Sequence, residues 1–149
     1  MKAVVQRVKK ASVKIGNKEI SSIGNGLLIF LAIRRGDKEE QARWMAHKIA
    51  NLRIFSDKAG KFNYSLIDIK GEALVVSQFT LYGSISTGFR PNFTEAASFE
   101  EAKLLYDKFI AFLKEEGIEV KTGKFGKLML IEILNDGPVT IILEKNPSL

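Results

Sequence analysis

The chain has 149 residues, of which 46% are hydrophobic and 27% charged. This composition fits one globular domain and excludes a disordered or fibrous chain. There is no cysteine, which excludes disulfides, thiolate metal sites and a cysteine nucleophile. The formal net charge of +6 permits attraction to a polyanion such as RNA, although 23 basic residues mixed with 17 acidic ones also fit a solvated surface.

The sequence contains no segment expected to cross a membrane. The longest apolar run, Leu27–Ile33, has seven residues, far fewer than the roughly 20 that a spanning helix needs. Polar and charged residues interrupt the first residues at once, so the apolar segment of a signal peptide is missing. We therefore expect a cytoplasmic protein with no membrane partner.

The first third of the chain predicts strands followed by a helix. Apolar and polar residues alternate in short steps over Ala3–Ile23, and Ile15–Lys18 is typical of a hairpin turn. Gly26–Ile33 is apolar on both faces, which predicts a buried central strand. Asp37 with Glu40 resembles a variant capping box at the start of a helix. The apolar positions of that helix are Ala42, Met45, Ala46, Ile49 and Leu52.

The rest of the chain predicts a second helix among further strands. Ser98 and Glu101 form a capping box, and Gly117 stands where a helix C-terminus prefers glycine. The apolar positions between them are Ala102, Leu105, Tyr106, Phe109, Phe112 and Leu113. The strand-like runs are Glu72–Gln78, Ile118–Thr122, Leu128–Leu134 and Val139–Leu143, with a turn at Asn135–Pro138 between the last two.

These elements indicate the fold class. Strands outnumber helices about three to one, and no repeat or linker divides the chain. We expect an α/β (mixed α+β) fold with two main helices and a mostly antiparallel or mixed sheet. A single domain is expected over residues 1–149.

The usual catalytic groups are absent from the sequence. The one histidine, His47, lies in the first predicted helix without the Cys or acidic neighbours of a metal site, so we interpret it as a surface or packing residue. A serine or threonine nucleophile therefore lacks its commonest general base. No glycine pattern fits a phosphate loop or a dinucleotide-binding turn. We expect no metal site and no cofactor.

Two short motifs stand at the ends of predicted strands, where loops tend to hold functional groups. The first is Ser77–Leu81 (SQFTL), which alone also fits the two faces of an ordinary alternating strand. The second is Asn135–Thr140 (NDGPVT), which alone also fits a tight turn, because Asn, Asp, Gly and Pro all form turns.

Together, at this separation, the two motifs resemble the paired signature motifs of the D-aminoacyl-tRNA deacylase family. Three further stretches are similar to that family in the right order, Val5–Val8, Arg53–Asp57 and Thr122–Phe125, so the resemblance covers Met1 to about Leu143. It implies hydrolysis of the ester bond of D-aminoacyl-tRNA, which releases free D-amino acid. It also implies a homodimer with a barrel-like core and its active site at the subunit interface.

The resemblance assigns chiral selection to Gly137, Pro138 and Arg7. Gly137 and Pro138 resemble a pair that is joined by a cis peptide bond and reaches into the partner subunit's pocket. The carbonyls of such a pair accept the amino group of a D-residue and obstruct an L side chain, so L-aminoacyl-tRNA is rejected. Arg7 matches the arginine that holds the pair in place. Glycine escapes this filter, so mischarged Gly-tRNA(Ala) is a second expected substrate.

The resemblance places the scissile ester beside Ser77, Gln78, Phe79 and Thr80. Thr80 resembles a proposed nucleophile, yet no base is evident in the sequence to activate it. The alternative that we prefer is an oxyanion hole made by the backbone N–H groups of Phe79 and Thr80. In that mechanism the terminal 2′-hydroxyl of the tRNA assists the attack of water.

The expected partner is the 3′ aminoacyl end of tRNA, and DNA is not expected. Phe125 and Met129 match positions that hold the terminal adenosine in a slot suited to stacking a base, although Met129 equally fits core packing. The alternative function is a non-catalytic nucleic-acid-binding dimeric module. The basic charge and the aromatic-rich segment Phe89–Phe99 favour it, but it gives no role to either motif.

Overall fold

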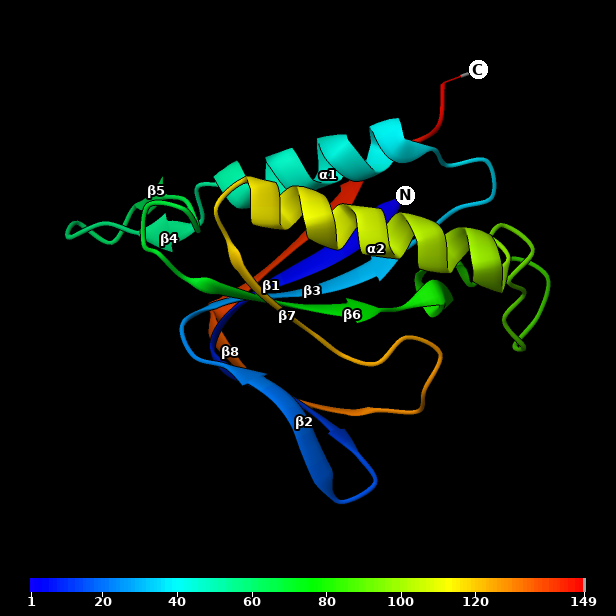
Figure 1. The fold of residues 1–149 in the computed structure, drawn as a ribbon, viewed down its shortest axis with the longest axis horizontal. Coiled ribbons are helices and arrows are strands. Elements are labelled where there is room, and N and C mark those ends of the chain that lie inside the picture. The colour runs from blue at the N-terminus through cyan, green and yellow to red at the C-terminus, as the bar shows by residue number, and fades with distance from the viewer. Residues whose placement is uncertain (149) are drawn as a thin grey trace.

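A six-stranded mixed sheet forms the centre of the molecule, and the computed structural model describes residues 1–148 (Figure 1). The strands of this sheet are β1 (Lys2–Ile15), β2 (Lys18–Ile23), β3 (Gly26–Ala32), β6 (Glu72–Ser77), β7 (Glu119–Thr122) and β8 (Leu130–Glu144). Their order is β2-β1-β3-β6-β7, with β8 paired to β1. A small separate hairpin joins β4 (Phe55–Ser56) and β5 (Phe62–Tyr64).

The strand pairing brings the sheet close to a closed barrel. β1 runs antiparallel to β2, β3 and β8, whereas the β3–β6 and β6–β7 pairs are parallel. The expected mostly antiparallel or mixed sheet is therefore confirmed. The β1–β2 hairpin reaches β7, where Ser21 Oγ donates to the carbonyl of Thr122 over 2.8 Å. Lys121 Nζ donates to the carbonyl of Ser22 over 3.0 Å in the same place.

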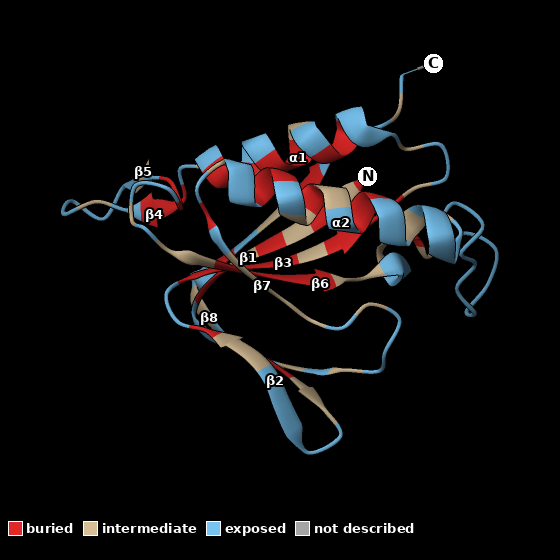
Figure 2. Cartoon of the chain, in the orientation of Figure 1, coloured by how far each residue is buried: buried red, intermediate tan, exposed pale blue. Residues whose placement is uncertain are grey.

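Two helices, α1 (Glu39–Asn51) and α2 (Phe99–Glu115), lie side by side across one face of the sheet. Figure 2 shows their buried residues on the sides turned toward the strands. The fully buried members of this main core include Met45, Ile49, Phe109, Leu113, Leu27, Ile29 and Val75. A smaller cluster joins the β1–β2 hairpin to the other side chains of β3 and β6: Val8, Val13, Ile23, Leu28, Leu74 and Val76. Burial on both faces of β3 was expected from its apolar sequence.

The starts of the two helices differ in how well the sequence predicted them. The capping box at α2 is confirmed, because Ser98 N donates to Glu101 Oε2 over 3.2 Å and Glu101 N donates to Ser98 Oγ over 3.4 Å. The box predicted at Asp37 and Glu40 is wrong by one residue, since the N–H of Lys38 donates to Gln41 Oε1 over 2.8 Å. The carboxylate of Asp37 is used elsewhere, by the N–H of Arg34 at 2.7 Å. Within residues 1–148, no helix combines the length and apolar character needed to span a membrane.

The turn predicted at Asn135–Pro138 is also wrong, because β8 continues through it as one strand. β8 pairs with β1 on both sides of the motif, and the register shifts between Gln6 and Val8. The residues Asp136–Val139 consequently stand opposite Arg7 alone. The motif is a bulge in a continuous ladder, and bulges, like turns, accept residues with unusual backbone angles.

Candidate active site

The SQFTL segment begins at the carboxyl end of β6, a strand that lies between β3 and β7. Ser77 is the last residue of β6, and the N–H of Gln78 donates to the carbonyl of Leu31 over 2.8 Å. This bond extends the pairing with β3 by one residue. The 3₁₀ turn η1 (Phe79–Tyr82) follows at once and brings the chain to the surface, where Phe79 is 53% exposed.

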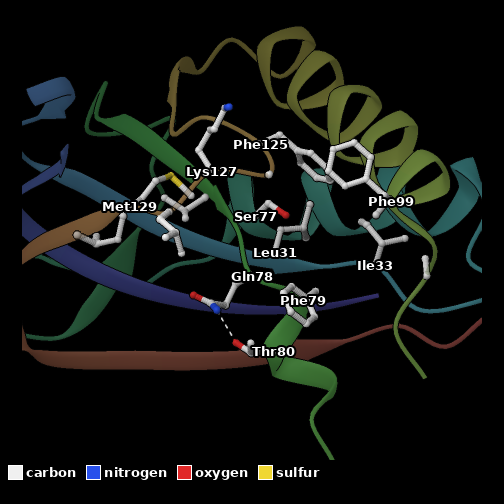
Figure 3. A pocket seen from close by; sticks show the side chains of 16 residues that line it. Leu31, Ile33, Ser77, Gln78, Phe79, Thr80, Phe99, Phe125, Lys127 and Met129 are labelled. Carbon is white, nitrogen blue, oxygen red and sulfur yellow. Dashed lines mark hydrogen bonds between the residues drawn. The ribbon is translucent and has the colours of Figure 1, made fainter. Parts of the chain in front are cut away.

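This segment lines a pocket with a volume of about 600 Å³ (Figure 3). The pocket lies between the end of β3, the β6–η1 segment, the first turn of α2 and the connection from β7 to β8. Its labelled lining residues are Leu31, Ile33, Ser77, Gln78, Phe79, Thr80, Phe99, Phe125, Lys127 and Met129. A concave, largely apolar pocket with a few polar groups is the usual form of a small-ligand site.

The structure brings together most of the site residues that the sequence singled out. The lining includes Ser77, Gln78, Phe79, Thr80, Phe125 and Met129. Arg7, Gly137 and Pro138 do not line the pocket of the same chain. Leu31, Ile33 and Phe99 also line the pocket, although they were not expected there. Their only signal is position, because each stands at the end of a strand or the start of a helix.

The side chains of the pocket offer little acid–base chemistry. Lys127 is the one ionisable side chain among the described residues that line it. Gln78 Nε2 donates to Thr80 Oγ1, the bond that is dashed in Figure 3. His47 lies on α1 with an exposed side chain and contacts Glu116 Oε1 at 2.8 Å, which confirms it as a surface residue. The described lining residues therefore include no carboxylate or imidazole that could activate Thr80.

Two backbone N–H groups of the pocket wall are free to donate hydrogen bonds. The first N–H groups of a helical turn have no acceptor inside that turn. Accordingly, the N–H groups of Phe79 and Thr80 form no hydrogen bond to another group within residues 1–148. Two adjacent free N–H groups on a pocket wall can stabilise a negatively charged oxygen.

An aromatic wall closes the opposite side of the pocket. Phe125 meets Phe99 edge to face at 5.0 Å and an interplanar angle of 72°, and it meets Tyr106 at 5.3 Å. Burial raises the pKa of the Tyr106 phenol, whose hydroxyl donates to a β6 carbonyl over 3.0 Å. Met129 Sδ accepts the N–H of Lys124 over 3.4 Å. These contacts fix an apolar slot that suits a flat ring.

Arg7 ties the bulge of β8 to the connection that follows α1. Its guanidinium is buried, and Nε donates to the carbonyl of Asp136 over 3.2 Å. Nη1 donates to the carbonyl of Ile54 over 2.8 Å and to Ser56 Oγ over 3.3 Å. Nε also lies 3.3 Å from the carboxylate of Asp136, so one side chain contacts three residues.

The bulge presents two exposed residues, Gly137 and Pro138, which are joined by a cis peptide bond. Gly137 has a φ of 124°, a value that favours glycine, and an added Cβ would lie only 3.0 Å from Arg7 Nη2. Asn135 Nδ2 donates to the carbonyls of Arg7 and Val139 over 2.9 and 3.0 Å. The exposed pair is thus held from both sides.

A model of the D-Tyr-tRNA(Tyr) deacylase family matches residues 4–144, a range that includes both motifs. The chain belongs to this family. Among family members named D-aminoacyl-tRNA deacylase, the protein of Aquifex aeolicus (strain VF5) is 54% identical over 97% of both chains. The protein of Thermotoga petrophila with the same name is 50% identical over 98% of both chains.

Two solved structures are similar to this member of the deacylase family. One is named c-Myc DNA Unwinding Element Binding Protein, with a TM-score of 0.92 and 43% identity over 98% of this chain and 99% of its own. The other is described as a probable eukaryotic D-amino acid tRNA deacylase, with a TM-score of 0.81 over 95% of this chain and 97% of its own. At 18% identity, the second similarity shows the shared fold.

The role of Arg7 in holding the bulge can be measured as stability. Arg7→Ala leaves the carbonyls of Ile54 and Asp136 without their donor, so we expect the free energy of unfolding to fall by about 1–3 kcal/mol in urea denaturation. The matched control is Lys9→Ala, because exposed Lys9 also pairs with Asp136, at 3.7 Å. That change should cost less than about 1 kcal/mol. Equal losses in the two variants would contradict this account of Arg7.

Proposed function

We propose that the protein hydrolyses the ester bond between a D-amino acid and the 3′ end of tRNA, which releases free D-amino acid and tRNA. The observation that carries the proposal is the pocket at the end of β6, where the SQFTL segment faces an aromatic slot. Relatives with 50–54% identity over nearly their whole length are named D-aminoacyl-tRNA deacylases.

In the proposed mechanism, water adds to the ester carbonyl and the backbone stabilises the charge that develops. The carbonyl oxygen becomes an oxyanion and accepts hydrogen bonds from the backbone N–H groups of Phe79 and Thr80. The carbon–oxygen bond to the ribose then breaks, and the ribose oxygen takes the proton. Because the described lining offers no carboxylate or imidazole, the terminal 2′-hydroxyl of the tRNA assists the water. Ser77 and Gln78 fix the shape of the pocket, and Gln78 does so through its hydrogen bond to Thr80.

The aromatic wall is the proposed binding site of the terminal adenosine. Phe125 and Met129 bound an apolar slot whose geometry is fixed by Phe99, and unpaired bases commonly stack on such side chains. Lys127 at the same pocket, and neighbouring Lys124, form no ion pair within residues 1–148 and are available to phosphate. In the proposal, the ester lies at η1 and the nucleoside lies at the β7–β8 connection.

The proposed assembly is a homodimer that pairs along β8. β8 has 15 residues and a strand partner on one edge, β1, among the described residues. It carries exposed apolar side chains at Leu130, Leu134 and Ile142, and a long apolar edge strand is a template for pairing with another chain. Gly137 and Pro138 lie on this strand outside the pocket of their own chain, so a second copy placed here can receive them in its pocket.

Chiral selection follows from that arrangement in our proposal. The backbone carbonyls around Gly137 and Pro138, held by Arg7, meet the α-carbon of the substrate and leave no space for an L side chain. Glycine has no side chain to exclude, so Gly-tRNA(Ala) is also a proposed substrate. Our proposal assigns all of these roles to a single domain over residues 1–149.

The test of the function compares D- and L-tyrosyl-tRNA. We expect D-Tyr-tRNA to be deacylated with a kcat/KM at least about 100-fold above that of L-Tyr-tRNA, since a fixed backbone obstacle penalises one configuration. Acid-gel separation of charged and uncharged tRNA measures both rates. Hydrolysis of the two substrates at similar rates would refute chiral selection, and hydrolysis of neither would refute the function.

A threonine substitution separates the two mechanisms. Thr80→Ala removes the hydroxyl and keeps the N–H, so we expect kcat to stay within about tenfold of the wild-type value, whereas losing one oxyanion donor costs about 10²–10³. Thr80→Ser is the matched control, because it retains both groups. Complete inactivity of a folded Thr80→Ala protein, or an acyl group trapped on Thr80, would instead establish the nucleophile.

A charge on β8 tests the dimer. Leu134→Lys places a cation on the exposed edge, and we expect light scattering after size exclusion to show a shift from dimer to monomer with loss of deacylation. Leu104→Lys is the control, because Leu104 is exposed to the same 60% on α2, away from β8. That variant should remain a dimer. A monomeric wild-type protein that is fully active would rule out the shared site.

A further inference from the structure

The connection between η1 and α2, residues 83–98, has no role in the chemistry proposed above. The pocket is lined on both sides of this connection, by Phe79 of the preceding turn η1 and by Ala97 and Phe99 around the start of α2. Figure 1 shows this connection as a loop beyond the end of the sheet, next to the first turn of α2. The loop therefore borders the pocket.

The root of the loop is fixed on the SQFTL segment. Ser84 and Asn92 exchange two backbone hydrogen bonds of 2.8 and 2.9 Å, which close the loop into a hairpin. Phe93 then packs edge to face on Phe79, with ring centroids 5.1 Å apart. Gly83 permits this contact, since an added Cβ would lie 2.9 Å from the Phe93 ring. The position of the loop is thus set by the pocket wall.

The other flank of the loop is held by the chain after β3. The N–H of Arg35 donates to the carbonyl of Glu95 over 2.9 Å, and Arg34 Nη2 pairs with the Glu95 carboxylate at 3.1 Å. Arg34 is therefore already neutralised. Arg35 forms no side-chain hydrogen bond or ion pair within the described chain and stands beside the loop.

The tip of the loop, in contrast, makes no contacts that would explain its residues. The side chain of Phe89 is fully exposed. Arg90 forms no ion pair, hydrogen bond or cation–π contact within residues 1–148. A large aromatic ring in water costs free energy unless something covers it. The pair combines a flat apolar ring with an unneutralised guanidinium.

We propose that Phe89 and Arg90 bind the unpaired nucleotides that immediately precede the terminal aminoacylated adenosine. A base stacks on the Phe89 ring, and the Arg90 guanidinium pairs with a backbone phosphate. The inference rests on the proposed function, because it needs the 3′ end of tRNA in the pocket. The rigid root then holds this contact at a fixed distance from the ester, so the loop reads an extended single strand.

Kinetics on two substrates test the proposal. Phe89→Ala should raise KM for D-Tyr-tRNA about 5- to 150-fold with little change in kcat, the equivalent of about 1–3 kcal/mol for one stacked base. KM for D-tyrosyl-adenosine, which lacks the preceding nucleotides, should be unchanged. Ile85→Ala is the matched control, because Ile85 is an apolar residue of the same loop that is 70% exposed. This variant should keep the wild-type KM for both D-Tyr-tRNA and D-tyrosyl-adenosine.

Two further variants separate stacking from simple apolar contact. Phe89→Trp should retain the wild-type KM for D-Tyr-tRNA. Phe89→Leu should raise this KM as much as Phe89→Ala does, because leucine has no ring face. Arg90→Ala should reduce the slope of log affinity against log salt by about 0.7, the value for one phosphate contact on a single strand. A Phe89→Leu variant with wild-type KM would overturn the stacking step.

A spectroscopic measurement gives a readout that does not depend on turnover. A single-stranded oligonucleotide ending in the tRNA 3′ sequence carries 2-aminopurine at the penultimate position, and its fluorescence should be quenched by the wild-type protein and not by Phe89→Ala. Equal quenching by both proteins would overturn the proposal.

Two other results for Phe89→Ala would also overturn it. One is a rise in KM for D-tyrosyl-adenosine equal to the rise for D-Tyr-tRNA, and the other is a change in oligomeric mass, which would assign the loop to a subunit contact. If the wild-type protein hydrolyses neither substrate, the proposed function itself fails, whereas an active wild type with an unaffected Phe89→Ala variant refutes the loop alone.

Discussion

The strand β1 has hydrogen-bonded neighbours on both edges, with β8 along one edge and β3 followed by β2 along the other. The rest of the sheet depends on this pairing, because β6 pairs with β3 and β7 pairs with β6. β1 also supplies Arg7, whose buried guanidinium joins the β8 bulge to the carbonyl of Ile54. The pocket at the end of β6 and the exposed Gly-Pro pair on β8 therefore take their relative positions from one strand.

In the proposed mechanism, the chemistry of the pocket depends on backbone conformation more than on side-chain identity. Burying a carboxylate or an imidazole shifts its pKa and costs desolvation energy, and the described lining uses neither. The proposal gives the stabilisation of the oxyanion to two N–H groups at the start of η1, a turn whose position is set by the bond from Gln78 N to Leu31 O. Any residue type except proline supplies such a group. The constraint on the sequence is therefore that the chain must leave β6 in this conformation.

The sequence predicted those elements whose determinants are local. The central strand β3 is apolar on both faces, and the cap of α2 needs only Ser98 and Glu101. The bulge was mistaken for a turn because the same residue types suit both, and what distinguishes them is continued pairing with β1, at a sequence separation of 129 residues between Arg7 and Asp136. The cap at Asp37 failed because an N–H of the preceding turn already takes its carboxylate. Family resemblance identified six lining residues, whereas Leu31 and Phe99 reach the pocket through tertiary packing that no spacing reveals.

The pairing of β1 with β8 also determines when during synthesis the molecule can become complete. Lys2 lies opposite Glu144 and Val13 lies opposite Ile131, so a ribosome makes β1 long before it makes β8. Until β8 emerges, β1 has β2 and β3 as partners and an open edge. Contacts between such distant segments slow folding, because a long loop must close before they form. Phe125 and Met129 emerge only shortly before β8, so the nascent chain completes its sheet and its pocket at nearly the same time.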